Sequence, residues 1–149
     1  MMSVESGVVD ANILVYAVDA EAPQHQAARA LLDAARDATT TLYVTSQILC
    51  EFYSIVTNPR RVASACSPDE ALRAISAFLA LPGLHVLPAP ARVVIGWMEL
   101  LRRHPVRGGD VFDLQLVATM QANNVQRIYT FNAVDFEVFS ELTALAPSR

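Results

Sequence analysis

Residues 7–17, GVVDANILVYA, are apolar almost throughout, yet they include Asp10 and Asn12. The stretch is typical of a buried strand that runs into a helix. Asp10 therefore either caps the following helix or holds a ligand at the end of the strand, and the stretch alone leaves both readings open. If the strand continued past Asp10, Asn12 would point the same way and would be able to orient a neighbouring carboxylate.

Strand-like and helix-like segments alternate along the rest of the chain. Further strands are predicted over residues 39–46, 84–90 and 125–132, with an edge strand over 143–147. Helices are predicted over residues 23–37, 46–61, 67–83, 91–104 and 108–124, with a short one over 133–142. This alternation is typical of an α/β protein with a parallel sheet, and its length of 149 residues suits a single domain over residues 1–149.

Several of these helices have recognisable ends. Ser46 is the expected N-cap of the helix that should stop before Pro59. Ser67 and Glu70 predict a capping box, with Pro68 at the first helical position. One face of the helix over 91–104 is apolar and should be buried; it comprises Val93, Val94, Trp97, Leu100 and Leu101.

The charge balance limits the possible functions. Fifteen acidic and eleven basic residues give a net charge of −4, which argues against tight, nonspecific binding of nucleic acid through a basic surface. A nuclease whose acidic residues surround a metal stays possible. All eleven basic residues are arginine, so mechanisms that need a catalytic lysine are excluded.

Other features of the composition point to the cytoplasm. No apolar run approaches the roughly 18 residues that a membrane span needs, and the first seven residues, MMSVESG, do not resemble a signal peptide. Cys50 and Cys66 have no metal or disulfide spacing, so we interpret them as small packed residues in a reducing compartment.

Acidic residues occur where the predicted strands end or the next helices begin: Asp10, Glu51, Asp110, Asp113 and Asp135. In a parallel sheet these positions meet at one edge. Two unit charges 4 Å apart repel by about 4 kcal/mol at an effective dielectric constant near 20, so a cluster of acids needs protons or a cation. Oxygen ligands without convergent histidine or cysteine suit Mg²⁺ or Mn²⁺.

Each of these acids also has an ordinary explanation. The aspartates suit helix caps or first helical turns, where a carboxylate interacts favourably with the helix dipole, and Glu51 suits a solvated helix face. The prediction of a metal site therefore depends on the joint pattern. His25, His85 and His104 are scattered and have no ligand spacing.

Four blocks of the sequence, taken in order, resemble a known family. VVDANIL, SQILCEF, DVFDLQLVATM and IYTFNAVDF are together similar to a PIN domain, specifically a VapC-like ribonuclease toxin of a type II toxin–antitoxin system. The resemblance extends over essentially the whole chain. It implies a three-layer α/β/α sandwich with a small, mostly parallel central sheet, and a cytoplasmic endoribonuclease that depends on Mg²⁺ or Mn²⁺.

The resemblance also implies which residues act. Asp10, Glu51, Asp113 and Asp135 match the acidic quartet of the family, with Asp10 and Asp113 as the expected direct metal ligands. The role of Asp110 is open, and Asn132 stands where many relatives have a further acid. Metal-assisted attack of water on the phosphodiester should leave 5′-phosphate and 3′-hydroxyl ends.

The family further implies a homodimer and inhibition by a VapB-like antitoxin. Two local basic groups are candidates for holding RNA phosphates, although solvated helix ends explain them equally well: Arg60 and Arg61, and Arg102, Arg103 and Arg107.

Other classes of protein fit less well. A haloacid-dehalogenase-like phosphatase needs a second aspartate at the position of Asn12 and also a lysine, and a response-regulator receiver needs the same lysine. No glycine-rich phosphate loop is present. The remaining alternative is a catalytically inactive PIN-like module that binds RNA or protein.

Overall fold

Five parallel strands form one central sheet in a computed structural model that describes residues 4–148. The order of the strands is β3-β2-β1-β4-β5. Their bounds are β1 Gly7–Val9, β2 Leu42–Val44, β3 Leu84–Val86, β4 Arg127–Tyr129 and β5 Thr143–Leu145. Every predicted strand is present, and the predicted edge strand is β5, which pairs in parallel with β4. Residues 1–3 and 149 lie outside the described residues. All four belong to the expected domain, and residues 1–3 also belong to the stretch compared with a signal peptide.

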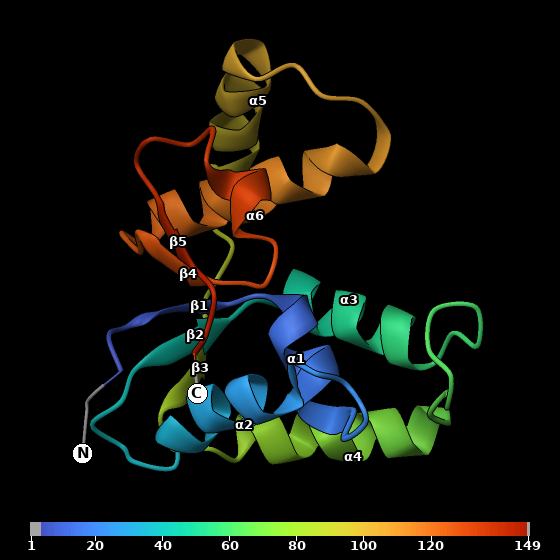
Figure 1. Ribbon diagram of the computed structural model, residues 1–149. Helices are drawn as coiled ribbons and strands as arrows, with labels where there is room; N and C mark the ends of the chain where they lie inside the picture. The colour runs from blue at the N-terminus through green and yellow to red at the C-terminus, as the bar shows by residue number, and fades with distance from the viewer. Residues whose placement is uncertain (1–3, 149) are drawn as a thin grey trace.

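Helices cover both faces of the sheet (Figure 1). One layer contains α1 Ala11–Val18, α2 His25–Ala34, α3 Ser46–Val56 and α4 Pro68–Leu79. The other contains α5 Val93–Arg103 and α6 Val111–Ala122, with the 3₁₀ turns η1 Gly108–Asp110 and η2 Ala133–Phe136. The expected α/β/α sandwich is therefore confirmed, with a sheet that is entirely parallel.

The two layers follow from the order of the strands. From β1 the chain passes to β2 and β3 on one side, and then crosses to β4 and β5 on the other. The direction of winding thus reverses between the neighbouring strands β1 and β4. Ligands of open α/β sheets bind at the carboxyl ends of the strands at such a switch point.

The start of the chain differs from the simplest expectation in one respect. β1 is buried and ends at Val9, Asp10 is the N-cap, and α1 begins at Ala11. Asn12 therefore lies in the first turn of a helix, so the condition under which it would point the same way as Asp10 along a strand is not met. The carboxylate of Asp10 ends the strand early because it accepts a hydrogen bond from the backbone N–H of Ala11.

The boundaries of other helices show which local sequence signals were sufficient to predict where a helix begins or ends. The capping box of Ser67 and Glu70 is confirmed at the start of α4. The N-cap of α3 is Thr45 rather than Ser46, because the buried Thr45 hydroxyl accepts a hydrogen bond from the N–H of Ile48 at 3.1 Å. The predicted helix over 133–142 is only the 3₁₀ turn η2.

A continuous core lies between the sheet and both helical layers. The largest fully buried side chains include Ile13, Phe52, Leu114 and Ile128, which come from α1, α3, α6 and β4. On α5, Val93 and Leu100 are buried, but Val94 is 49% exposed, so the predicted apolar face is only partly covered. Within residues 4–148, no helix is long and apolar enough to cross a membrane.

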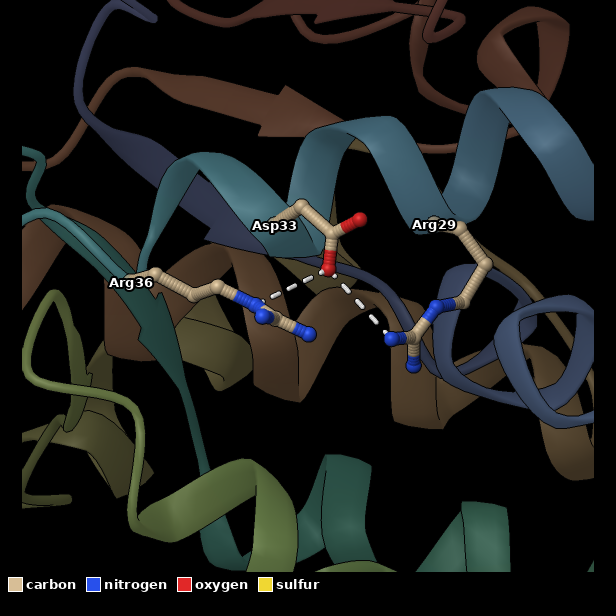
Figure 2. A network of polar contacts seen from close by, with 3 residues as sticks. All are labelled: Arg29, Asp33 and Arg36. Carbon is tan, nitrogen blue, oxygen red and sulfur yellow. Dashed lines mark hydrogen bonds and ion pairs between the residues drawn. The ribbon is translucent and has the colours of Figure 1, made fainter.

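The outer surface of α2 has a small charged network (Figure 2). Asp33 accepts contacts from Arg29 and Arg36, each at 3.3 Å. All three side chains are well exposed, and ion pairs of this kind contribute about 0–1 kcal/mol. Arg29 and Arg36 therefore form weak ion pairs on the surface of α2.

Candidate active site

Asp10 lies at the switch point, and each of its two carboxylate oxygens accepts a hydrogen bond from a different residue. Oδ1 accepts the 2.8 Å hydrogen bond from Ala11 N–H that caps α1. Oδ2 accepts a 2.8 Å hydrogen bond from the hydroxyl of Thr130, which follows the adjacent strand β4. Asp10 is thus a helix cap, and its second oxygen is held at the carboxyl ends of the two central strands.

Thr130 and Asn12 form a polar network around this second oxygen. The Thr130 hydroxyl accepts hydrogen bonds from Asn12 Nδ2 and from the backbone N–H of Asn132, both at 3.0 Å. Asn12 Oδ1 accepts from the N–H of Phe131 at 3.1 Å, and its Nδ2 lies 3.4 Å from Asp10 Oδ2. Because the side chain of Thr130 is fully buried, this network fixes the orientation of the Asp10 carboxylate.

Glu51 is held from within its own helix and across to α6. Its Oε1 accepts a 2.8 Å hydrogen bond from Gln47 Nε2, one turn earlier on α3. The same nitrogen donates to the backbone carbonyl of Phe112 at 2.9 Å. Gln47 therefore ties Glu51 to the start of α6, a role that the sequence did not reveal because it depends on the packing of two distant helices.

The glycine pair places Asp110 and Asp113 at the start of α6. Gly108 has a φ of +60°, in the left-handed region that glycine adopts without strain, and it opens the turn η1. Asp110 ends that turn and is the N-cap residue of α6, as its ordinary explanation predicted, although its side chain makes no capping hydrogen bond. Asp113 lies in the first turn of α6.

Three of the four predicted acids line one cavity of about 430 Å³, which we call the acidic cavity. Its polar lining comprises Asp10, Asn12, Asp19, Glu51, Arg61, Asp113 and Asn132, together with Tyr16. Asp135, exposed on η2, instead lines an adjoining cavity of about 350 Å³ with Asp113 and Asp110. Asp113 belongs to both cavities, so it connects the cavity with Asp135 to the one with Asp10 and Glu51.

The acids affect one another electrostatically. Burial, followed by repulsion from Asp10, Asp135, Glu51 and Asp110, raises the pKa of Asp113 to about 6. Burial is also the main cause that raises the pKa of Asp10 and of Glu51, and hydrogen bonds from Thr130 and Gln47 partly oppose it. None of the four predicted acids has an ion-pair partner in the part of the chain that the structure describes.

This donor set fits a hydrated divalent cation. Within residues 4–148, no three histidine, cysteine or acidic side chains already converge closely enough to enclose an ion. Mg²⁺, however, keeps several of its waters and commonly uses only one or two carboxylates. Carboxylates whose pKa values are raised by burial and mutual repulsion are stabilised when such a charge enters.

The two predicted basic groups have different surroundings. Arg61 lines the acidic cavity. Arg102 and Arg103, in contrast, pair with Glu99 and Glu141 on the surface, and they line neither of the two cavities that hold the predicted acids. Of the three histidines, His104 lies at the wall of the cavity with Asp135 and packs edge-on against Phe139.

The fold and the site define a parallel α/β protein with acidic side chains at its switch point, and comparisons with known proteins give the family. The PIN domain profile matches residues 7–142. Ribonuclease VapC43 from Mycobacterium tuberculosis (strain H37Rv) is 32% identical over 116 residues, which are 78% of this chain and 79% of that protein. The VapC ribonuclease Mb2897 from Mycobacterium bovis has the same identity and coverage. The chain belongs to the PIN-domain family, in its VapC group.

Solved structures agree on the fold. VapC20 from Mycobacterium tuberculosis, described as a toxin that cleaves the sarcin–ricin loop, superposes with a TM-score of 0.65 at 20% identity, over 89% of this chain and 94% of that one. VapBC2 from Rickettsia felis, bound to a DNA fragment from its promoter, superposes with a TM-score of 0.68 at 18% identity, over 96% and 99%. VapC nucleases of this family generally depend on a divalent metal.

Proposed function

We propose that this protein is a metal-dependent endoribonuclease that hydrolyses RNA phosphodiester bonds at the acidic cavity. The observation that carries the proposal is the convergence of Asp10, Glu51 and Asp113, from three separate elements, on one cavity at the switch point of the sheet. The VapC ribonucleases that the chain resembles support RNA as the substrate.

The acids have distinct parts in this reaction. Asp10 and Asp113 would hold Mg²⁺ or Mn²⁺ directly, with Glu51 and Asp135 acting directly or through water. When bound, such an ion neutralises charge on the phosphate and lowers the pKa of a coordinated water. Thr130 and Asn12 keep the Asp10 carboxylate in place, and Gln47 does the same for Glu51.

The bond changes follow from attack by water. A new bond forms between the water oxygen and phosphorus, and the bond from phosphorus to the 3′ oxygen breaks. The proton of the water passes to a carboxylate, for which we propose Glu51 Oε2, and the leaving 3′ oxygen takes a proton from solvent and becomes a hydroxyl. The products are a 5′-phosphate and a 3′-hydroxyl, whereas a 2′,3′-cyclic phosphate would contradict this mechanism.

We further propose that the chain is one PIN domain over its whole length of 149 residues, that it forms a homodimer, and that it acts on RNA in the cytoplasm. A VapB-like antitoxin is the proposed inhibitor. Chains from VapBC2 of Rickettsia felis and from a toxin–antitoxin complex of Klebsiella pneumoniae have the same fold as this chain, which supports a partner of this kind.

The test is cleavage of end-labelled total RNA by protein freed of any co-purified partner. Reactions contain Mg²⁺, Mn²⁺ or EDTA, and Asp10→Asn is compared with Asp33→Asn on the exposed face of α2. We expect discrete, metal-dependent cuts that are lost in Asp10→Asn and retained in Asp33→Asn. Absence of cleavage by the folded wild-type protein with either metal would instead favour an inactive binding module.

A further inference from the structure

Beside the acidic cavity lies a larger one of about 520 Å³, which we call the outer cavity. Glu51, Ile55, Arg61 and Asp113 line both cavities, so the two are continuous along one wall. The outer cavity adds Phe112, with Gln47, Cys50, Ser54, Gly109 and Asp110. A molecule that enters the outer cavity therefore lies directly next to the acids.

Phe112 is a large aromatic residue that is exposed at the outer cavity. Its side chain is 53% exposed, whereas Leu114 and Leu116 on the same helix are buried. A single exposed apolar residue is common on protein surfaces. Phe112 differs because it lines a concave site with an aromatic residue and directly precedes Asp113, which lines the same site.

The backbone of Phe112 is held in place by a hydrogen bond. Its carbonyl accepts the 2.9 Å hydrogen bond from Gln47, which also holds Glu51. The start of α6 and the acid on α3 therefore keep a fixed relative position. An aromatic side chain has few rotatable bonds, so on this fixed backbone it loses little conformational entropy when it contacts a ligand.

Arg61 supplies the complementary charge. It is the only basic side chain that lines either cavity within residues 4–148, and it makes no ion pair there. An aromatic ring and a free guanidinium that line one cavity are the combination with which proteins hold single-stranded nucleic acid, the ring for a base and the cation for a phosphate.

We propose that Phe112 and Arg61 form a nucleotide subsite next to the acids, in which Phe112 stacks on an unpaired base and Arg61 contacts a neighbouring phosphate. This inference rests on the proposed ribonuclease function and adds that the bound RNA must have an unstacked base at this position. Duplex RNA, whose bases are already stacked, cannot occupy the subsite.

The test measures binding of a 5′-fluorescein-labelled single-stranded RNA of about ten nucleotides in EDTA, so that no cleavage interferes. Phe112→Leu keeps an apolar side chain but removes the aromatic ring, whereas Phe112→Tyr keeps the ring. We expect the leucine variant to bind about tenfold more weakly and the tyrosine variant to bind like the wild type. Thermal unfolding verifies that both variants are folded.

A scan with abasic nucleotides locates the contact. At one position, removal of the base should weaken wild-type binding about as much as Phe112→Leu does, and the same removal should have no further effect in that variant. Arg61→Gln should flatten the dependence of log K on log salt concentration by about 0.7, the value for one phosphate contact to a single strand. Arg73→Gln on α4 is the control.

The outcomes separate the two proposals. If the wild type and Phe112→Leu bind the RNA equally well, or if removal of a base has the same effect in both, the proposed subsite is wrong. This holds even if Phe112→Leu loses affinity for a protein partner. Cleavage by the wild type in Mg²⁺ is scored separately. Binding that depends on Phe112 without any cleavage would overturn the hydrolysis and leave the base contact standing.

Discussion

The hydroxyl of Thr130 donates a 2.8 Å hydrogen bond to Oδ2 of Asp10, across 120 residues of sequence. The bond joins the ends of the neighbouring strands β1 and β4 at the switch point of the sheet. Because Thr130 is fully buried and also accepts hydrogen bonds from Asn12 and Asn132, it determines where the Asp10 carboxylate points. The site depends on this second layer of polar side chains as well as on its acids.

Thr130→Val tests that dependence. Valine has nearly the same shape but lacks the hydroxyl, so Asp10 loses a donor, and the Asn12 amide and the Asn132 N–H lose their acceptor. We expect RNA cleavage to fall about tenfold to a hundredfold and the free energy of unfolding to fall by about 1–3 kcal/mol. Thr130→Ser, which keeps the hydroxyl, should restore most of the activity. Equal activity in the valine and serine variants would contradict the assigned role.

Asp113→Asn should stabilise the metal-free protein while it abolishes cleavage. The pKa of Asp113 is about 6 in the folded protein, against an ordinary value of 3.8. Both states hold the proton below about pH 4. Between about pH 4 and 6 the unfolded chain loses its proton first, so the wild type loses stability as the pH rises. Above this range the ionised carboxylate remains a constant penalty.

Urea unfolding in EDTA at a series of pH values measures this effect. The advantage of Asp113→Asn over the wild type should grow from nearly zero at about pH 4 to about 1 kcal/mol above about pH 7. This magnitude is below the full value for such a shift in pKa, because the side chain is partly exposed and solvent screens its charge. An advantage that is constant across the pH range would refute this electrostatic account. Mg²⁺ should reduce the advantage, because only the wild type gains from the cation.

Gln47→Ala removes the donor that favours the ionised form of Glu51. Burial already raises the pKa of Glu51, and the hydrogen bond from Gln47 partly opposes that rise. The acid limb of the pH profile of cleavage should therefore move to higher pH in this variant. Ser46→Ala, one residue earlier and exposed, is the matched control and should leave the profile unchanged. A lower rate with an unmoved acid limb would argue against an electrostatic role for Gln47.

Ser67→Ala tests a part of the fold that lies apart from both cavities. Ser67 accepts the 3.2 Å hydrogen bond from Glu70 N–H in the capping box of α4. Its loss should lower the free energy of unfolding by about 1 kcal/mol, measured by urea denaturation, with cleavage unchanged under folding conditions. Ser64→Ala, in the exposed loop before α4, should have little effect on either. If Ser67→Ala proves as stable as the wild type, the capping box contributes nothing measurable.

The sequence by itself determined the order of strands and helices, because the apolar periodicity, Pro68 and the capping box are local signals. It also placed the acids at strand ends and helix starts, where a parallel sheet brings them to one edge. It did not determine that Asn12 is helical, because this depends on Asp10, the residue after the end of β1, capping α1 with its carboxylate. It placed the cap of α3 at Ser46, although the buried hydroxyl of Thr45 forms the bond.

Only the tertiary structure decided which side chains share a cavity. Asp10, Glu51 and Asp113 do so, whereas Asp135 reaches Asp113 from the adjoining cavity. Gln47 on α3 donates a hydrogen bond to the carbonyl of Phe112, 65 residues away in the sequence. No local sequence pattern extends over that separation. Hydrogen bonds and repulsion between residues far apart in sequence depend on the packing of whole elements. For that physical reason they became visible only when the chain was folded.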